Sequence, residues 1–441
     1  MNKLNDIPKE INDQLNIAKT HLDKLLHKLP EALMETAKNY GAMVRQRVIK
    51  SPQELLLALL MYASSGISLR VLSACLAVIG IADMSDQAWQ KKIIKCGPWL
   101  SFLLKETMPK LSYQSRTPLR GRTVKLLDGS ILQQAGTKGK RGGESIRVHM
   151  SYNLNLGCMD DVLVTDKYTA ESVTHFPITP NAIYITDAGY SKGVNLAHIV
   201  SCYGDALFRA SPNHLSLAAD NKGTEKIDMV KKLDTKANLI DFACHVHTRK
   251  NEYEPVRIIA SRLPEDKALL AKERKIRVAK RKQIKNIKTA TLVYAEWIIL
   301  MTSLSDEYSA EELLELYRSR WQIELLFKRI KQSFAVSKLP VASLNHSKVI
   351  VLSWLILWAL TEKDALAMEA FLLSKEADMS RYSLWSMHSF LFNQLKMSIN
   401  CLCALFFDLA EHAGYVFSRL QNHRSSRANH YAFFHFSQGS L

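Results

Sequence analysis

The sequence predicts a mixed α/β fold flanked by helical regions. Strand-like segments at 123–130, 147–154 and 159–168 follow one another directly. A buried strand at 181–189, a helix near 194–202 and a strand at 205–211 come next. Strands in meander order that later alternate with helices are typical of a mixed sheet covered by helices.

Both ends of the sequence have helical patterning. Ser51-Pro52-Gln53-Glu54 resembles a capping box before the apolar run LLLALLMYA. Residues 68–95 show a helix, a break and a second helix, a pattern typical of a DNA-reading helix-turn-helix and also of a plain helical hairpin. The apolar run at 349–360 has about twelve residues, fewer than the roughly twenty that span a membrane. We expect a buried core helix there and no membrane partner.

The charge balance indicates an anionic partner. The 441 residues carry 59 Lys plus Arg against 42 Asp plus Glu, a formal net charge of +17. Such an excess favours nucleic acid first and a membrane surface second. With 47% hydrophobic and 23% charged residues, the composition excludes an intrinsically disordered chain. Seven scattered cysteines predict reduced thiols in a cytoplasmic protein.

Changes in patterning divide the sequence into four stretches. We expect a helical DNA-binding region at 1–115 and a core built from 116–211 and 291–340. A β-rich insertion at 212–290 ends in the segment KERKIRVAKRKQIKNIK (272–288), which holds nine basic residues and one acid. This segment fits either a solvated helix face or a track for the DNA backbone. A helical region at 341–441, suited to dimerisation, completes the chain.

The segment 310–332 predicts one helix with a polar stripe. Tyr317, Arg320, Glu324, Lys328 and Lys331 are spaced by 3, 4, 4 and 3 residues. At about 100° per residue they fall within an arc of about 80°. Taken alone, the stripe is most simply a solvated face with salt bridges, because Arg320 and Lys328 each lie four residues from Glu324.

Two aspartates change the interpretation of this stripe. Asp128 ends the strand TVKLLD and Asp187 ends the strand AIYITD, each before a turn that contains glycine. Such residues commonly begin turns. Two strand-end aspartates and a helix-borne glutamate also form the carboxylate set that hard cations such as Mg²⁺ need. Two such ions about 4 Å apart support phosphoryl transfer.

The motifs around these residues resemble those of bacterial DDE transposases of the insertion sequence four family. The resemblance rests on DGS at Asp128, TDAGY at Asp187, the string Y-x2-R-x3-E-x6-K from Tyr317 and the strand EWIILMTS at 296–303. It covers roughly residues 120–335, while the termini and the insertion agree in layout only. It implies a ribonuclease-H-like core with a β-rich insertion between the second aspartate and the glutamate.

The resemblance also implies a catalytic and metal-binding triad of Asp128, Asp187 and Glu324. In such enzymes this triad holds two Mg²⁺ ions, for which Mn²⁺ can substitute. The reaction would be cut-and-paste transposition: nicking at each terminal inverted repeat, a hairpin intermediate, and attack of the 3′ ends on target DNA. Every step is a phosphoryl transfer, so one metal site can serve all of them.

Five further residues receive DNA-binding roles from the resemblance. Arg320 and Lys331 would grip phosphates of the transposon end, and Lys328 would add a further contact. Tyr317 would help to hold a base flipped out during hairpin formation, and Trp297 occupies the place of the family's stacking tryptophan. The expected partners are double-stranded DNA at transposon ends and target, and a second copy of the chain as a homodimer. We expect the protein in the bacterial cytoplasm, at the nucleoid when bound to DNA.

Alternative functions remain open from the sequence. The segment Gly189 to Gly193 fits the G-x-S-x-G nucleophile elbow of an α/β-hydrolase with Ser191 as nucleophile, but it leaves the basic charge and the 317–331 stripe unexplained. A DNA-binding protein that keeps the transposase fold without cutting is the other alternative, and Mg²⁺-dependent nicking distinguishes the two. Cys244-His245-x-His247 and Cys401-x-Cys403 lack a second half at zinc-ligand spacing.

Overall fold

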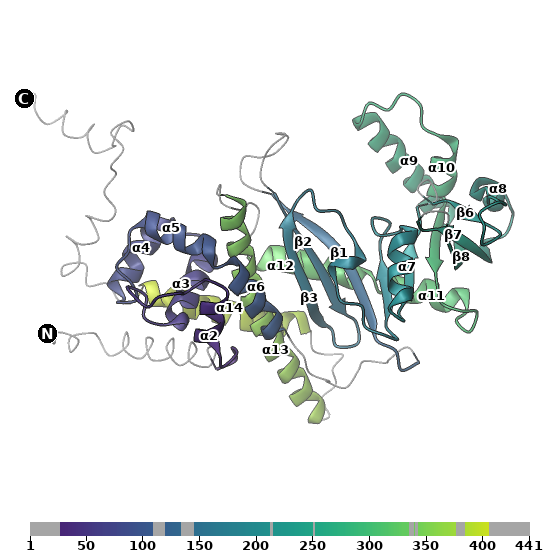
Figure 1. The fold of residues 1–441 in the computed structure, drawn as a ribbon. Helices are drawn as coiled ribbons and strands as arrows, with labels where there is room; N and C mark the ends of the chain where they lie inside the picture. The colour runs from purple at the N-terminus through teal and green to yellow at the C-terminus, as the bar shows by residue number, and fades with distance from the viewer. Residues whose placement is uncertain are drawn as a thin grey trace, which may run out of the picture. The chain divides into compact units, whose positions relative to one another are not determined.

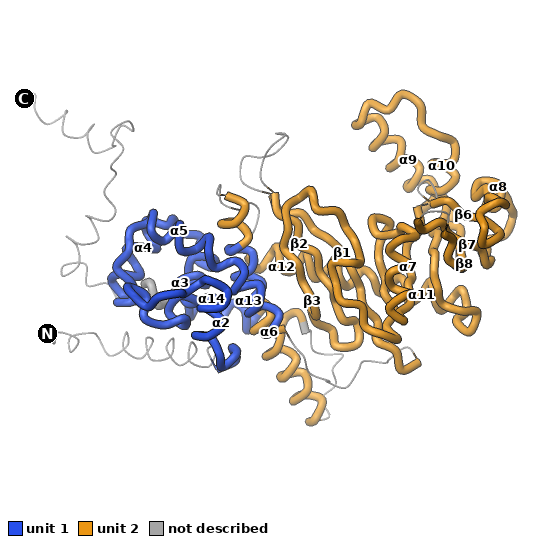
Figure 2. The backbone as a smooth tube through the Cα atoms, viewed as in Figure 1, with its two compact units in different colours: residues 1–106, 349–357, 390–441 blue, residues 107–348, 358–389 orange. Residues whose placement is uncertain are grey.

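The computed structural model describes residues 27–108, 120–133, 145–211, 215–249, 252–334, 339, 343–375 and 384–404. The chain divides into two compact units (Figure 2). Unit 1 comprises residues 1–106, 349–357 and 390–441, and unit 2 comprises residues 107–348 and 358–389. The helical patterning expected before residue 27 and after residue 404 lies outside the described residues.

Unit 1 is built from helices. They are α2 (Leu33–Asn39), α3 (Pro52–Ser65), α4 (Leu69–Val78), α5 (Asp86–Lys95) and most of α6 (Gly97–Thr107) (Figure 1). A segment of α13 (Leu344–Ser374) also belongs here. Its Trp354 indole donates a 2.6 Å hydrogen bond to the carbonyl of Ala63 in α3, which ties this segment to the unit. The side chains of Trp89 and Trp99 are fully buried in the same core.

Serine caps begin three of these helices, as the sequence predicts. Ser51 and Glu54 form a capping box at the start of α3. The hydroxyls of Ser68 and Ser85 each accept a hydrogen bond from the backbone N–H three residues ahead, at 3.3 and 3.2 Å. Helices α4 and α5 pack against each other. The helix–break–helix pattern of 68–95 is therefore confirmed, and its reading of DNA stays a prediction.

The described residues of unit 2 form a nine-stranded sheet in the order β3-β2-β1-β4-β5-β9-β8-β7-β6. The strands are β1 (Val124–Leu132), β2 (Ile146–Asn153), β3 (Cys158–Asp166), β4 (Ile183–Thr186), β5 (Asp205–Arg209), β6 (Leu217–Ala218), β7 (Leu239–His247), β8 (Tyr253–Arg262) and β9 (Trp297–Thr302). An antiparallel meander of β1 to β3 continues into β4 and β5, which run parallel to β1. This is the ribonuclease-H-like arrangement that the sequence predicts.

Strand β4 is buried on both faces within the sheet. Ile183, Tyr184 and Ile185 are each 0% exposed, because β1 and β5 flank the strand and helices cover the sheet. A parallel strand that is buried on both faces needs such a continuous apolar run. Helix α7 (Gly193–Ser201) follows β4 and packs against β5 and β7.

The strands of the insertion extend the same sheet. β9 pairs antiparallel with β5 on one side and with β8 on the other, and β7 and β6 follow outward. Helices α8 (Met229–Leu233) and α9 (Glu265–Arg281) also belong to this stretch. α9 ends at Arg281, so the basic run of 272–288 continues beyond the helix.

The strand EWIILMTS that the sequence predicts at 296–303 is confirmed as β9 (Trp297–Thr302). Residues Thr289–Ala295 form helix α10, and the strand begins only at Trp297. α10 packs against α9 and β9. This tertiary packing overrides the strand preference of the β-branched and aromatic residues in the segment.

The single helix predicted for 310–332 is in fact two helices. α11 (Ala310–Arg318) and α12 (Trp321–Ser333) are separated at Ser319 and Arg320. The N–H of Arg320 bonds to the carbonyl of Tyr317 at 3.1 Å, and the N–H of Ile323 bonds to the carbonyl of Arg320 at 3.3 Å. These three-residue turns tighten the chain and end the α-helical hydrogen-bond ladder.

Two longer helices close the described part of the chain, α13 and α14 (Leu384–Ala404). The apolar run at 349–360 lies within α13, and all its residues are buried, which confirms the prediction of a core helix. Within the described residues, no helix is long and apolar enough to cross a membrane.

Candidate active site

Two adjacent parallel strands bring the predicted aspartates together. Leu127 of β1 pairs with Thr186 of β4, so Asp128 and Asp187 follow at the next register position. Asp128 Oδ1 accepts a hydrogen bond from the backbone N–H one residue ahead at 2.7 Å. Asp187 Oδ1 accepts one from the N–H two residues ahead at 2.8 Å. The prediction that Asp128 ends its strand is wrong, because β1 continues to Leu132 in its pairing with β2 and only the pairing with β4 stops at Leu127. Both aspartate side chains are half-buried at the point where β1 and β4 separate.

The electrostatics of the pair favour a positive ligand. Burial, and after it the negative charge of Asp187, raises the pKa of Asp128 to about 7. Arg320 opposes this rise and the charge of Glu171 adds to it. Carboxylates that repel each other in a half-buried site are stabilised by a cation placed between them.

Glu324 lies in the first turn of α12. The Arg320 guanidinium, four residues earlier, hydrogen bonds to Glu324 Oε1. The same guanidinium is close enough to Asp128 for each charge to affect the pKa of the other. Arg320 therefore links the helix-borne carboxylate to the aspartate pair.

Lys331 lies in the last turn of α12 and is held by a hydrogen bond to β1. Its ammonium donates a 2.6 Å hydrogen bond to the hydroxyl of Ser130, two residues after Asp128 on β1. Burial lowers the pKa of Lys331, and the charge of Asp128 opposes this effect. Lys328, the remaining lysine of the predicted stripe, is exposed.

The two predicted aromatic residues lie in different surroundings. Tyr317 is 8% exposed, and the Arg320 guanidinium carbon is 5.9 Å from its ring centre. Trp297, at the start of β9, is 2% exposed, and the guanidinium of Arg262 lies 4.6 Å from its ring centre. Tyr317 thus belongs with the carboxylates, whereas Trp297 is covered by an arginine of β8.

A basic groove begins beside the aspartate pair. Ala188, next to Asp187, lines a hollow of about 720 Å³ that extends along α9 and α10 and includes Trp297. Five basic side chains line the groove: Arg209, Lys267, Arg274, Lys275 and Arg277. This juxtaposition joins the basic segment of the insertion to the carboxylate site and suits a polyanion.

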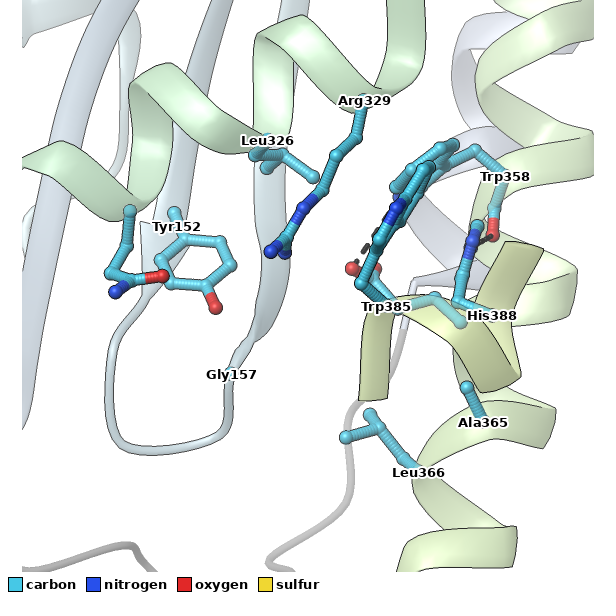
Figure 3. Close-up of a pocket in the computed structure, with 11 residues that line it drawn as sticks. Tyr152, Gly157, Leu326, Arg329, Trp358, Ala365, Leu366, Trp385 and His388 are labelled. Carbon is cyan, nitrogen blue, oxygen red and sulfur yellow. Dashed lines mark hydrogen bonds between the residues drawn. The ribbon is translucent and has the colours of Figure 1, made fainter. Parts of the chain in front are cut away.

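The opposite face of α12 is anchored by an aromatic cluster (Figure 3). The Arg329 guanidinium lies 5.2 Å from the ring centre of Trp385, and the rings of Trp358 and His388 are 3.9 Å apart. They line a small pocket of about 40 Å³. Burial raises the pKa of Glu362, which lines the same pocket, to about 8. This packing fixes the helix that carries Glu324.

The donor set fits a hard divalent cation. All predicted ligands are carboxylates, whose oxygens such ions prefer. Across the described ranges, no three His, Cys, Asp or Glu side chains converge as a metal-holding group. The third predicted ligand, Glu324, is hydrogen bonded to Arg320.

The sequence prediction missed two residues of this site. Glu171, in the loop after β3, lies against Gly129 and Gly189, the glycines that follow the two aspartates. The ring of Tyr190, the last residue of the motif TDAGY, is 0% exposed beneath them. Glu171 stands in no recognisable motif, and Tyr190 could have been noted only as part of TDAGY.

Ser191 does not have the surroundings of a nucleophile elbow. It is 2% exposed, and its hydroxyl donates a 3.0 Å hydrogen bond to the carbonyl of Ala188. A nucleophile needs an exposed oxygen and a base within reach. The hydroxyl instead stabilises the turn that follows Asp187.

The fold and site define a class of protein. A model described as the transposase DDE domain matches residues 119–360, more than half of the chain. The chain therefore belongs to the DDE transposase family, which implies nuclease and strand-transferring activity.

Similar proteins come from insertion sequence elements. The chain is 31% identical over 308 residues to the putative transposase InsL for insertion sequence element IS186A of Escherichia coli (strain K12). The alignment covers 68% of this chain and 82% of that protein. The transposase for insertion sequence element IS421 of Escherichia coli is also 31% identical, over 309 residues, with the same coverage.

Proposed function

We propose that the protein is a cut-and-paste transposase of the insertion sequence four family. It cleaves double-stranded DNA at the terminal inverted repeats of its element and joins the 3′ ends to target DNA. The observation that carries this proposal is the pair Asp128 and Asp187 on adjacent parallel strands, with Arg320 and Lys331 held beside them. DNA cleavage by this chemistry requires carboxylates that bind metal ions and, beside them, cationic side chains that bind phosphate.

Asp128, Asp187 and Glu324 would hold two Mg²⁺ ions, with Mn²⁺ as a substitute. Such ions, when bound, activate the attacking oxygen and stabilise the leaving oxygen of a phosphoryl transfer. Strand β1 and the end of strand β4 fix two of the three carboxylates before any ligand arrives. Helix α12 supplies the third, and its aromatic anchor behind Arg329 limits how far that helix can shift.

Arg320 has two roles in this proposal. In the protein without DNA it neutralises Glu324 through their hydrogen bond. With Glu324 holding an ion, the planar guanidinium would be free to bind two phosphate oxygens at once. Lys331, fixed by Ser130, offers a second phosphate contact from a defined position. Lys328 lies exposed on the same helix for a further contact.

Tyr317 and Trp297 would act on bases rather than phosphates. Tyr317 would help to hold the flipped base near the carboxylates. Trp297 would stack on it at the groove, where stacking of a base on an aromatic ring contributes about 1–3 kcal/mol. A base that reaches Trp297 competes with Arg262 for the ring face, because the guanidinium lies over that ring.

The basic groove would direct duplex DNA to the carboxylates. Its five cations follow α9 and the end of β5 towards Ala188. The hairpin route needs only this one site, since nicking, hairpin closure, hairpin opening and strand joining are all phosphoryl transfers. Two transposon ends must be paired, so we assign the working form as a homodimer and the region 341–441 as its expected interface.

The products formed on a labelled duplex test this proposal. The duplex carries the inverted repeat and its flanking DNA, and denaturing electrophoresis separates nicked strands from hairpins. Nicks at the repeat boundary, followed by a hairpin and by joining to a second DNA, are the expected result. Tight binding without any cut would contradict the proposal and favour the DNA-binding protein that no longer cleaves.

A further inference from the structure

A fourth carboxylate lies against the aspartate pair. A Cβ atom at Gly129 would lie 2.8 Å from Oε1 of Glu171, and a Cβ at Gly189 would lie 2.3 Å from Oε2. These glycines follow Asp128 and Asp187 by one and two residues. The Glu171 carboxylate therefore lies directly against the two glycines that follow the aspartates.

The charges around Glu171 connect it to the same site. Its Oε1 lies 3.5 Å from a guanidinium nitrogen of Arg147 on β2, and both side chains are largely buried. Burial, then the negative charge of Asp187, raises the pKa of Glu171, and the charge of Glu171 in turn contributes to the raised pKa of Asp128. Glu171 is thus part of one electrostatic unit with both aspartates, and Arg147 offsets a portion of its charge.

A buried phenol faces this unit. Tyr190 is 0% exposed, and its hydroxyl has no hydrogen-bond partner within the described parts of the chain. Burial, and then the negative charges of Glu171, Asp128 and Asp187, raise the pKa of Tyr190. A buried hydroxyl without a partner costs free energy in the folded state. The chain thus keeps an unpaired donor within electrostatic reach of three carboxylates, at a position where a phenylalanine ring would fill nearly the same volume.

We propose that Glu171 is a fourth carboxylate ligand of the divalent-cation site, and that the Tyr190 hydroxyl positions it by donating a hydrogen bond to its carboxylate in the loaded site. This inference rests on the proposed function of Asp128 and Asp187. Hard cations take six or more oxygen ligands, so two ions leave ample places for a fourth acid. An additional charge also raises cation affinity before DNA supplies its own phosphates.

Binding of Mn²⁺ to the full chain without DNA tests the proposal independently of catalysis. Electron paramagnetic resonance of free Mn²⁺ measures how much ion the protein removes from solution. Glu171→Gln keeps the shape of the side chain and should weaken Mn²⁺ binding at least tenfold or remove one bound ion. Glu307→Gln removes the same charge from an exposed position before α11 and should bind Mn²⁺ like the unmodified protein.

Asp128→Asn separates failure of this inference from failure of the proposed function. If Asp128→Asn loses Mn²⁺ binding and Glu171→Gln retains it in full, the fourth ligand is refuted and the function stands. If neither substitution affects Mn²⁺ binding, the metal site of the proposed function is itself wrong. Thermal unfolding without Mn²⁺ checks that each variant is folded.

Tyr190→Phe tests the positioning role with two readouts that move in opposite directions. Removing a buried hydroxyl without a partner should leave the melting temperature unchanged or raise it. Mn²⁺ affinity should nevertheless fall several-fold, because Glu171 loses its donor. A Tyr190→Phe protein that binds Mn²⁺ as tightly as the unmodified chain would show that the ring only packs, and would refute the positioning role.

Discussion

Replacing two arginines of the basic groove should make DNA binding less sensitive to salt. Arg274 and Arg277 on α9 are exposed and line the groove that begins beside Asp187. Each cation that neutralises a phosphate contributes about 0.9 to the slope of log K against log salt concentration. Arg274→Ala with Arg277→Ala should therefore reduce the slope by about 1.8 and weaken binding roughly 60-fold at about 0.1 M salt. The difference should vanish near 1 M salt, because counterion release then contributes nothing.

Fluorescence anisotropy with a labelled inverted-repeat duplex, repeated over a series of salt concentrations, measures this slope. Lys222→Ala with Lys236→Ala is the matched control, because both lysines are exposed in the insertion and neither lines the groove. The control removes the same net charge and should change the slope much less. Equal slopes for the arginine variant and the unmodified protein would refute the assignment of the groove to DNA.

Three further substitutions test the site and the fold. Arg320→Ala should slow end cleavage roughly 100-fold in single-turnover assays while duplex binding persists. The reason is that Glu324 and the scissile phosphate each lose a preorganised partner. An unchanged cleavage rate would contradict this. Gly193→Ala should cost about 1–3 kcal/mol in chemical denaturation, because its Cβ would lie 2.1 Å from the His247 carbonyl oxygen; undiminished stability would show that α7 shifts freely. Burial raises the pKa of Glu362 from 4.5 to about 8. Between these two pH values the Glu362 carboxyl is protonated in the folded state and ionised in the unfolded state. Stability should accordingly fall as pH rises from 4.5 to 8, by about 3 kcal/mol at pH 7 at about 1.36 kcal/mol per pKa unit. Glu362→Gln should flatten this profile, and an equally steep profile would exclude Glu362 as its cause.

Local signals in the sequence were sufficient for much of the fold. Serine residues before apolar runs predicted the starts of α3, α4 and α5, because a side-chain oxygen can satisfy a free N–H at a helix start. The alternation and apolar content of 123–211 predicted five strands of the sheet. The prediction that an aspartate follows the end of its strand is confirmed for Asp187 and wrong for Asp128, because β1 continues to Leu132 in its pairing with β2.

Features that depend on tertiary packing could not be predicted in this way. The turn at Ser319 and Arg320 contains neither glycine nor proline, so periodicity alone extended one helix through it. Helix α10 depends on its contacts with α9 and β9. Glu171 is separated by more than forty residues from Asp128 and follows no spacing rule, and only the structure shows its carboxylate against Gly129 and Gly189. The exchange of Arg320 between Glu324 and DNA likewise stays a prediction.

The most direct test of the central claim compares cleavage with binding in one variant. The duplex carrying the inverted repeat is incubated with Mg²⁺ or with EDTA, using the unmodified protein and Glu324→Gln at equal DNA occupancy. We predict nicks at the repeat boundary only for the unmodified protein with Mg²⁺, and near-equal DNA binding by both proteins. Full-rate nicking by Glu324→Gln, or nicking that persists in EDTA, would contradict the carboxylate site proposed here.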